Sequence, residues 1–189
     1  LKRSLDLFGA LTALLIFGPL MLLVALLVRL TSPGPILYRQ ERMGLDGRLF
    51  YALKFRSMRV DAEQSSGAMW AKRDDDRVTP LGRRLRGLSL DELPQIFNVL
   101  RGEMSLVGPR PERPVFIDHF KTKIPDYMLR QKVKAGITGW AQINGWRGNT
   151  SLEKRIECDL YYIENWSIWL DLKILALTPF KGFIHQNAY

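Results

Sequence analysis

The longest apolar stretch of the chain lies near its N-terminus. Residues 7–28, LFGALTALLIFGPLMLLVALLV, contain no charged side chain. As one helix they would be about 33 Å long, which is enough to cross a hydrocarbon core of about 30 Å. A secretory signal is disfavoured, because the apolar core is too long and no small-residue cleavage site is evident. We therefore predict a helix that inserts into a membrane.

Two features bear on whether this helix crosses the membrane. Gly18 and Pro19 lie near its middle, and a proline there predicts a kink because it removes a backbone donor. Lys2 and Arg3 precede the run, and basic residues also follow it, at Arg29, Arg39, Arg42 and Arg48. The positive-inside rule places both flanks in the cytoplasm, which slightly favours a re-entrant helix that returns to the same face. An ordinary kinked spanning helix stays the alternative.

The remaining pattern is one of short elements separated by proline- and glycine-rich turns. A turn is expected at residues 31–38, and strand-like alternation in the first half of residues 48–59. The helix candidates are residues 80–88, 90–100 (ended by Gly102), 115–132 (interrupted at Pro125), 151–164 and 166–180. Residues 107–114 hold three prolines and predict irregular backbone, and residues 134–148 predict a glycine-rich loop with short extended pieces.

The last apolar segment, residues 166–180, contains aromatic residues that are candidates for membrane contact. Trp166, Trp169 and Phe180 are placed to form an interfacial anchor, because tryptophan prefers the headgroup zone. A buried core helix fits the pattern equally well. A membrane anchor at the other end of the chain gives the interfacial interpretation more weight.

Composition and charge narrow the classes of function. The 189 residues include 28 Lys and Arg against 19 Asp and Glu, a net charge of +9, which points to nucleic acid, an anionic membrane or a phosphorylated substrate. Residues 1–60 hold nine basic and three acidic side chains, so most of the excess is close to the membrane helix. Nucleic acid is disfavoured because no helix-turn-helix, RRM, KH or zinc-finger pattern occurs. The single cysteine, Cys158, excludes an intramolecular disulfide and a cysteine-ligated zinc.

Asp91 and Glu92 are the candidates for chemistry. Two helix starts compete around them: a capping box from Ser89 to Glu92, or a helix with Pro94 in its first turn. In both cases the helix dipole favours the ionised carboxylates. An ionised aspartate is an acceptable nucleophile toward phosphorus, and an adjacent glutamate can hold a divalent cation or handle a proton. Arginines suited to phosphate surround them in sequence, at positions 83, 84, 86, 110, 113 and 147.

A series of short motifs carries a resemblance to a known family. In order after the apolar helix they are SPGP at 32–35, KFRSM at 54–58, LSLDELPQ at 88–95, LVGPRPE at 106–112, KAGITGWAQINGWRG at 134–148 and the D-x-x-Y of 159–162, with KRSLD at 2–6 before it. The chain resembles the bacterial sugar transferases, the monotopic phosphoglycosyl transferases. The resemblance implies an α-rich α/β fold with interfacial amphipathic helices. Residues 1–30 would form a re-entrant, Pro-kinked membrane helix and residues 31–189 one catalytic domain on the cytoplasmic face of the bacterial inner membrane.

The resemblance also implies a reaction. Such enzymes move a sugar-1-phosphate from a UDP-sugar to undecaprenyl phosphate and release UMP, the initiating step of exopolysaccharide, capsule or O-antigen synthesis. Asp91 matches the nucleophile, which would form a covalent phosphoglycosyl-aspartate. Glu92 matches its partner, and both would bind Mg²⁺.

Further positions match the family's substrate-binding residues. Pro109, Arg110 and Pro111 match a motif near the uridine. The matching charged positions are Lys54, Arg56, Arg83, Arg147 and Asp159. Arg56 as a core ion-pair partner and Asp159 as the structural partner of an arginine stay open. Lys2, Arg3 and Asp6 would set helix depth.

The sugar is expected to be glucose, because residues 180–189, FKGFIHQNAY, look most like glucose-1-phosphate transferases. Galactose is the alternative, and a non-enzymatic, membrane-tethered module that binds polyanions is the competing class. We also expect the chain to be the C-terminal part of a longer protein. A homo-oligomer stays open.

Overall fold

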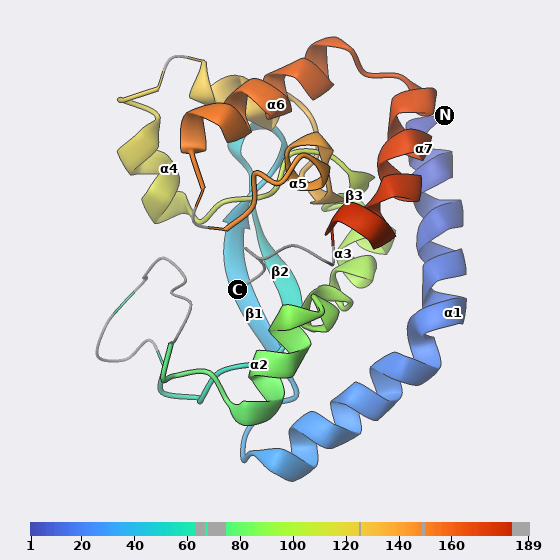
Figure 1. Cartoon of the computed structure of the whole chain (residues 1–189), viewed down its shortest axis with the longest axis vertical. Coiled ribbons are helices and arrows are strands. Elements are labelled where there is room, and N and C mark those ends of the chain that lie inside the picture. The colour runs from blue at the N-terminus through green and yellow to red at the C-terminus, as the bar shows by residue number, and fades with distance from the viewer. Residues whose placement is uncertain (63–66, 68–74, 125, 149, 183–189) are drawn as a thin grey trace.

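A computed structural model describes residues 1–62, 67, 75–124, 126–148 and 150–182. It is a mixed α/β, helix-rich structure, as expected, and its long apolar helix runs along one side of the molecule (Figure 1). Two short sheets and a set of shorter helices form the rest. The C-terminal segment on which the choice of sugar depended lies mostly outside the described residues, since these end at Gly182.

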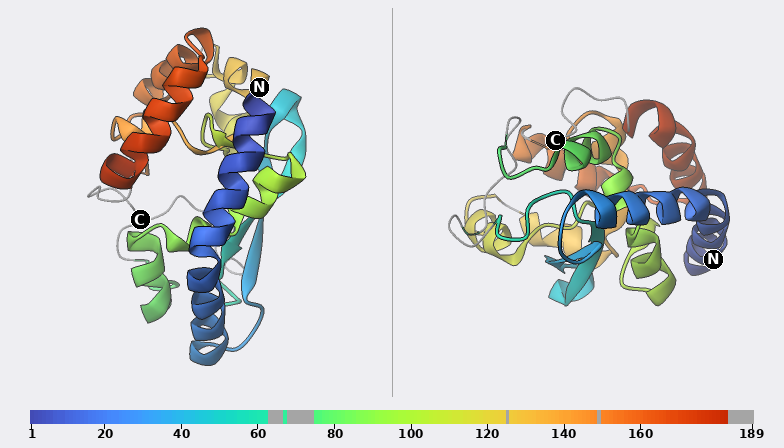
Figure 2. Two further views of the ribbon diagram at one scale, coloured as in Figure 1. Left: turned by 90° about the vertical axis from the view of Figure 1, so that its right-hand side faces the viewer. Right: turned by 90° about the horizontal axis from the view of Figure 1, so that it is seen from below.

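The long helix, α1, covers Lys2–Thr31 and is the one helix in the described ranges that is long and apolar enough to cross a membrane. It extends beyond both ends of the predicted run and contains Pro19 without interruption. Figures 1 and 2 show its path bending between the first and second halves. Leu15 and Leu22 are 81% and 75% exposed, while Ala10, Val24 and Val28 are buried. One narrow stripe of α1 therefore packs on the domain and the rest presents apolar side chains outward.

The larger sheet is an antiparallel hairpin. Strand β1 (Leu37–Met43) pairs with β2 (Leu49–Phe55) through a 3₁₀ turn at Leu45–Gly47. The sequence predicted β2 but missed β1, whose residues LYRQERM are mostly polar and largely exposed. Such an edge strand gives little apolar alternation to detect.

The segment that carries Asp91 lies between two helices. Helix α2 (Pro80–Gly87) starts at a Thr79 cap, and a 3₁₀ turn (Leu90–Glu92) leads into α3 (Gln95–Arg101), which ends at Gly102 in the left-handed conformation. Pro94 directly precedes α3, so the helix start at the proline is confirmed. The capping box from Ser89 to Glu92 is wrong, because the Ser89 side chain caps no backbone amide.

Short parallel strands form the smaller sheet. Strands β3 (Ser105–Val107) and β4 (Gly136–Thr138) pair where glycines allow close approach, since a Cβ on Gly136 would lie 2.1 Å from the Gly108 nitrogen. Between them the predicted helix at 115–132 is two elements, α4 (Pro114–Phe120) and a 3₁₀ helix at Tyr127–Lys132. Pro125 lies outside the described residues.

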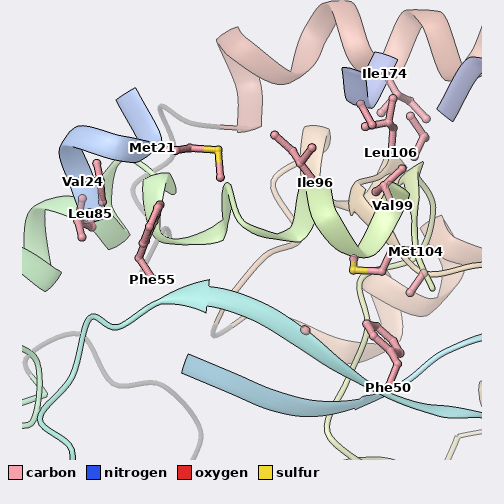
Figure 3. Close-up of a cluster of buried hydrophobic side chains, with 14 of the residues drawn as sticks. Met21, Val24, Phe50, Phe55, Leu85, Ile96, Val99, Met104, Leu106 and Ile174 are labelled. Atoms are coloured by element: carbon pink, nitrogen blue, oxygen red, sulfur yellow. The ribbon is translucent and has the colours of Figure 1, made fainter. Parts of the chain in front are cut away.

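Three helices complete the domain: α5 (Trp140–Ile143), α6 (Leu152–Glu164) and α7 (Ile168–Leu177), with a π turn at Thr178–Gly182. The core gathers side chains from α1, the hairpin, α2, α3, β3 and α7 (Figure 3). Val99, Met104 and Ile174 are fully buried in it. The core thereby fixes the hairpin against the turn that bears Asp91 and Glu92.

Candidate active site

Asp91 and Glu92 lie at one wall of an open cleft of about 300 Å³. They are 6% and 7% exposed and come from the 3₁₀ turn before α3. The facing wall is the hairpin, which contributes Lys54. The other charged residues that line the cleft are Arg42, Arg56, Arg59, Arg77, Arg86, Arg110, Glu112, Arg113, Arg147 and Arg155.

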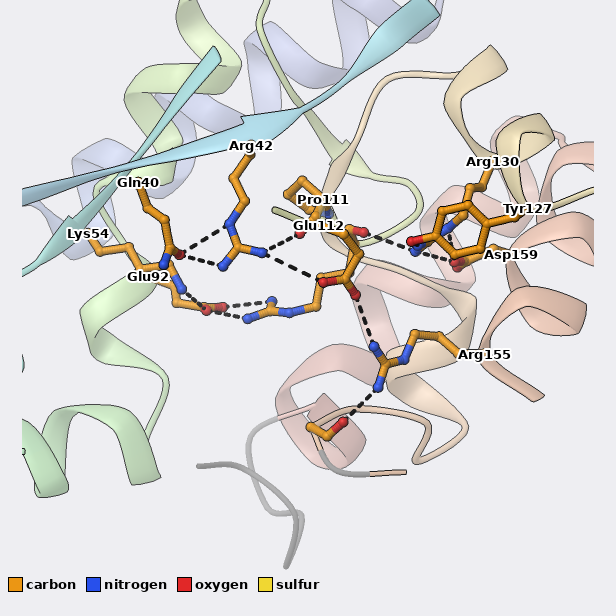
Figure 4. Close-up of polar contacts among 12 residues, drawn as sticks. Gln40, Arg42, Lys54, Glu92, Pro111, Glu112, Tyr127, Arg130, Arg155 and Asp159 are labelled. Carbon is orange, nitrogen blue, oxygen red and sulfur yellow. Dashed lines mark hydrogen bonds and ion pairs between the residues drawn. The ribbon is translucent and has the colours of Figure 1, made fainter. Parts of the chain in front are cut away.

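Glu92 is held by three cations, Lys54, Arg110 and Arg147. Figure 4 shows the contact with Lys54. The Lys54 Nζ lies 2.9 Å from Oε1, and Arg147 Nη2 lies 3.3 Å from Oε2. Arg110 binds both carboxylate oxygens, with Nη1 3.0 Å from Oε2 and Nη2 in contact with Oε1. Burial disfavours the charged form, but Arg110, Lys54 and Arg147 together hold the pKa of Glu92 well below its usual range. Glu92 is thus an ionised, fixed carboxylate.

Asp91 has the opposite surroundings. None of the described residues donates a hydrogen bond to its carboxylate or forms an ion pair with it, although it lines the cleft. Burial and the adjacent charge of Glu92 raise the pKa of Asp91, and Lys54, Arg86 and Arg147 oppose that rise. The carboxylate is open toward the cleft and surrounded by cations that do not bind it directly.

The loop that carries Arg110 is held by its main chain. Four successive carbonyls accept hydrogen bonds from three different segments: Pro109 from Gly136 N (2.9 Å), Arg110 from Arg130 Nη2 (3.0 Å), and Pro111 and Glu112 from Arg42 Nη1 (2.8 Å) and Met43 N (3.1 Å) of β1. The two prolines have no amide hydrogens of their own to pair. This loop therefore presents Arg110 to Glu92 from a fixed backbone.

Arg147 was predicted as a site residue, as were Lys54 and Arg110, and all three form ion pairs with Glu92. Arg147 Nη1 also donates to Ser89 Oγ at 2.9 Å, which ties the loop after α5 to the turn that bears Asp91. The structure thus brings five of the predicted residues together: Asp91, Glu92, Lys54, Arg110 and Arg147.

Arg56 lines the cleft but has a second task. Its Nη2 donates to the Ser32 carbonyl at 2.7 Å and to Ser32 Oγ at 2.6 Å, just beyond the end of α1. Arg56 is 6% exposed, and these contacts hold the end of α1 against β2.

Two predicted substrate residues are placed elsewhere. Arg83 is exposed on α2 and does not line the cleft; Arg86, on the same helix, does. Asp159 is 1% exposed and binds Arg130 Nε and Nη2 at 3.0 and 2.7 Å, away from the cleft. Of the two possibilities left open for Asp159, the structure places it as the partner of an arginine.

Sequence reasoning counted Arg86 and Arg113 among the arginines suited to phosphate but did not select them as site residues. It did not single out the other charged cleft residues, which are Arg42, Arg59, Arg77, Glu112 and Arg155. A signal existed for Arg86. Leu81, Gly82 and Leu85 mark the packed face of α2, and on a helical projection Arg86 lies closer to that face than Arg83. Glu112 ends the LVGPRPE motif, and Arg42 and Arg155 showed no local pattern that separates them from surface arginines.

The predicted membrane residues lie on the outside. Pro19 is exposed and Gly18 half-buried within α1. Trp169 is 80% exposed, whereas Trp166 is 41% exposed and donates Nε1 to Asp171 at 3.2 Å. Phe180 is also exposed, at 72%. Large apolar side chains therefore lie outward at both ends of the described chain.

Comparison with known proteins agrees with the motifs. The bacterial sugar transferase model matches residues 1–185, and the chain belongs to this family. The UDP-glucose:undecaprenyl-phosphate glucose-1-phosphate transferases of Escherichia coli (strain K12) and Klebsiella pneumoniae are 51% and 52% identical to it over 193 and 192 residues. Both matches cover 100% of this chain and 41% of the relative.

Another relative has a different sugar in its name. The UDP-N-acetylgalactosamine-undecaprenyl-phosphate N-acetylgalactosaminephosphotransferase of Aeromonas hydrophila is 48% identical over 180 residues, covering 94% of this chain and 42% of the relative. The chain thus spans about two fifths of the length of these curated relatives.

Proposed function

We propose that this chain is the catalytic part of a phosphoglycosyl transferase. It transfers a sugar-1-phosphate from a UDP-sugar to undecaprenyl phosphate and releases UMP. The observation that carries the proposal is the open Asp91 carboxylate in a cation-lined cleft, next to a Glu92 that three cations hold in place. The names of the E. coli and K. pneumoniae relatives support this reaction.

The chemistry follows two displacements at one phosphorus. An Asp91 oxygen attacks the sugar-bearing phosphorus of the UDP-sugar, the bond to the bridging oxygen breaks, and UMP leaves with that oxygen. A lipid phosphate oxygen then attacks the same phosphorus, releasing the Asp91 carboxylate and forming the lipid diphosphate sugar. Arg86, Arg110 and Arg147 would offset the charge on the transferring group, because phosphoryl transfer depends mainly on positioning and charge stabilisation.

A divalent cation fits this cleft only with the substrate's help. The described part of the chain contains no group of three or more acidic, histidine or cysteine side chains that could hold a metal. Mg²⁺ commonly uses one or two carboxylates together with substrate phosphates and water. Asp91 has open oxygens for this, and Glu92 would share oxygens that its cations already contact. When bound, Mg²⁺ would neutralise charge on the diphosphate.

The membrane topology we propose is re-entrant. Both ends of α1 contact the same domain: Arg3 donates to the carbonyls of Val99 and Leu100 at 2.6 and 2.8 Å, and Arg56 binds Ser32 beyond the other end. A helix whose two ends are fastened to one domain has both ends on one side of the bilayer. The bend between the two halves of α1 (Figure 2) and the basic residues at both ends of the apolar run support the same arrangement. The domain would then lie on the cytoplasmic face of the inner membrane, where soluble UDP-sugars are available.

Cysteine labelling tests this topology. Ser4 and Thr31 are both exposed, and each is changed to Cys in a Cys158→Ser background. In inverted and right-side-out vesicles, an impermeant maleimide should label both positions from the cytoplasmic side. Labelling from opposite sides would establish a spanning helix.

Glucose is the sugar we propose. The glucose-1-phosphate transferases are 51% and 52% identical, but the N-acetylgalactosamine relative is 48% identical, so identity alone separates the sugars poorly. A panel of UDP-glucose, UDP-galactose and N-acetylated UDP-sugars, each with undecaprenyl phosphate, decides among them. Highest kcat/KM with UDP-glucose is the expected result.

The reaction itself is tested by UMP release in detergent or bilayer discs. Asp91→Asn should lower UMP release by at least about 10⁴-fold, because the nucleophile is lost while the shape is kept. Unchanged far-UV circular dichroism shows that the variant is folded, and Asp118→Asn on the exposed face of α4 is the control. Retained turnover in Asp91→Asn would contradict the proposal.

A further inference from the structure

Two buried ion pairs hold the main chain at, or next to, two of the arginines that bind Glu92. Arg110 is the first. Arg130 Nη2 lies 3.0 Å from the Arg110 carbonyl and 2.7 Å from Asp159 Oδ2, so one guanidinium joins the carboxylate to the main chain of the cleft arginine. Arg130 and Asp159 are 5% and 1% exposed. The Tyr127 ring lies under the guanidinium, 5.2 Å from its carbon.

The second arrangement has the same form. Arg155 Nη1 donates to Glu112 Oε1 at 2.9 Å, and Arg155 Nη2 donates to the Gly148 carbonyl at 2.7 Å, directly after Arg147. Arg155 is 3% and Glu112 7% exposed. Figure 4 shows the Arg155–Glu112 pair, with Arg155 on the side of Glu112 away from Glu92; both residues of the pair line the cleft.

Both arrangements originate on one helix face. Arg155 and Asp159 are four residues apart on α6, so their side chains lie one above the other on the same face. We propose that α6 positions the two cleft arginines: Asp159 acts through Arg130 on Arg110, and Arg155, paired with Glu112, acts on Arg147. This inference rests on the proposed function and names further positioning residues for that reaction.

Energetics favour positioning over a contribution to stability alone. Buried ion pairs are weak evidence for stability, because desolvation offsets the attraction between the charges. Here each pair ends on a carbonyl at or next to a residue that binds Glu92. A misplacement of about 1 Å at such a site can cost about 100-fold in rate, so fixed backbone is valuable there.

Matched variants on α6 separate the two arrangements. Asp159→Asn removes the charge that holds Arg130, and Arg155→Lys keeps a charge but lacks the second nitrogen needed to bridge Glu112 and Gly148. Glu157→Gln is the control, since it breaks the exposed Lys154–Glu157 pair on the same helix. If Asp159→Asn does not fold, Arg130→Lys carries the same test, because a single ammonium group cannot reproduce the guanidinium's contacts.

The first measurement is the rate of UMP release in single and double variants, which shows whether a change on α6 is coupled to a change at a cleft arginine. We expect Asp159→Asn and Arg155→Lys each to lower kcat/KM by roughly 10- to 100-fold, and Glu157→Gln to change it by less than about twofold. In double-mutant cycles, Asp159→Asn should be strongly non-additive with Arg110→Lys and additive with Arg147→Lys. Arg155→Lys should show the reverse pairing. A merely structural loss would give no such selectivity.

The second measurement does not depend on catalysis. By hydrogen-exchange mass spectrometry of the full chain, Asp159→Asn should speed amide exchange in residues 108–112 and leave 145–148 unchanged. Arg155→Lys should speed exchange in 145–148 and leave residues 108–110 unchanged, because Arg155 contacts Glu112 but not that part of the loop. Equal changes in both segments, or none in either, would overturn the inference.

The two proposals fail in different ways. Selective exchange in a native chain that releases no UMP from any UDP-sugar would uphold the positioning by α6 and contradict the proposed function. UMP release with additive effects in every cycle would uphold the function and overturn the positioning.

Discussion

Two buried clusters of charge in this protein are built differently. The first, which we call the foot cluster, lies where the start of α1 meets α7 and β3. Its Asp171 is fully buried and accepts from Lys2 Nζ and the Tyr162 hydroxyl, both at 2.7 Å, and from Trp166 Nε1. Asp6 in the same cluster accepts from Ser105 Oγ at 2.8 Å and Leu106 N at 2.9 Å. Asp171 thus accepts on both carboxylate oxygens, and Asp6 accepts two hydrogen bonds on its Oδ1.

The cleft has one carboxylate of the same kind and one that differs. Glu92 is engaged by Lys54, Arg110 and Arg147, whereas Asp91 accepts from none of the described residues. A buried carboxylate with all its donors fixes structure, and a buried carboxylate without donors is available for chemistry but costs stability. The comparison therefore separates the anchor of α1 from the candidate nucleophile by hydrogen bonding alone.

Removing a carboxylate from each cluster should change stability in opposite directions. Asp171→Asn leaves Lys2 without its ion pair and should lower the free energy of unfolding by about 3 kcal/mol. Burial raises the pKa of Asp91, so folding disfavours its ionised form above that pKa; Asp91→Asn should raise the free energy of unfolding by about 1 kcal/mol.

Thermal unfolding in detergent, followed by circular dichroism, measures both changes. A midpoint lower by roughly 10 °C for Asp171→Asn and higher by a few degrees for Asp91→Asn is expected. Asp171→Asn should keep its kcat per folded molecule. A fall in the midpoint for both variants would remove the distinction between the clusters.

A smaller effect concerns pH. Asp91 must be ionised to attack, and because burial and Glu92 raise its pKa, UMP release should fall on acidification at a pH above the usual aspartate range. Arg86 opposes that rise, so Arg86→Gln should raise the pKa further and move the acid limb of kcat upward. Arg84→Gln, exposed on the same helix, should leave the limb in place. An acid limb unmoved by Arg86→Gln would mean that another group sets it.

The fold was predictable where one element carries a long local pattern. The apolar run of α1, the helical spacing of α6 and the glycine after α3 all placed their elements close to the observed bounds. Strand β1 was missed because its own residues show no strand pattern. It is a strand because it pairs with β2 across the hairpin. Strand β3 is three residues long and exists through its pairing with β4, which no local signal contains.

The site residues that stand in short sequence motifs were predictable, and those that reach the cleft from other elements were less so. Asp91, Glu92 and Arg110 stand in short motifs whose residue types point to phosphate chemistry. Arg83 and Arg86 differ only in the direction of their side chains on α2, which depends on what the helix packs against. Arg155 reaches the cleft from α6 across the fold, and only tertiary structure places it there.

The central claim is that Asp91 is the nucleophile. Its most direct test is the intact mass of the full chain incubated with UDP-glucose and Mg²⁺ in the absence of lipid acceptor, with peptide mapping of any adduct. The account predicts a gain of one hexosyl phosphate located on Asp91, lost on adding undecaprenyl phosphate and absent in Asp91→Asn. An adduct on another residue would contradict it. So would UMP release at full rate in the presence of the lipid acceptor if the protein never carries the sugar phosphate.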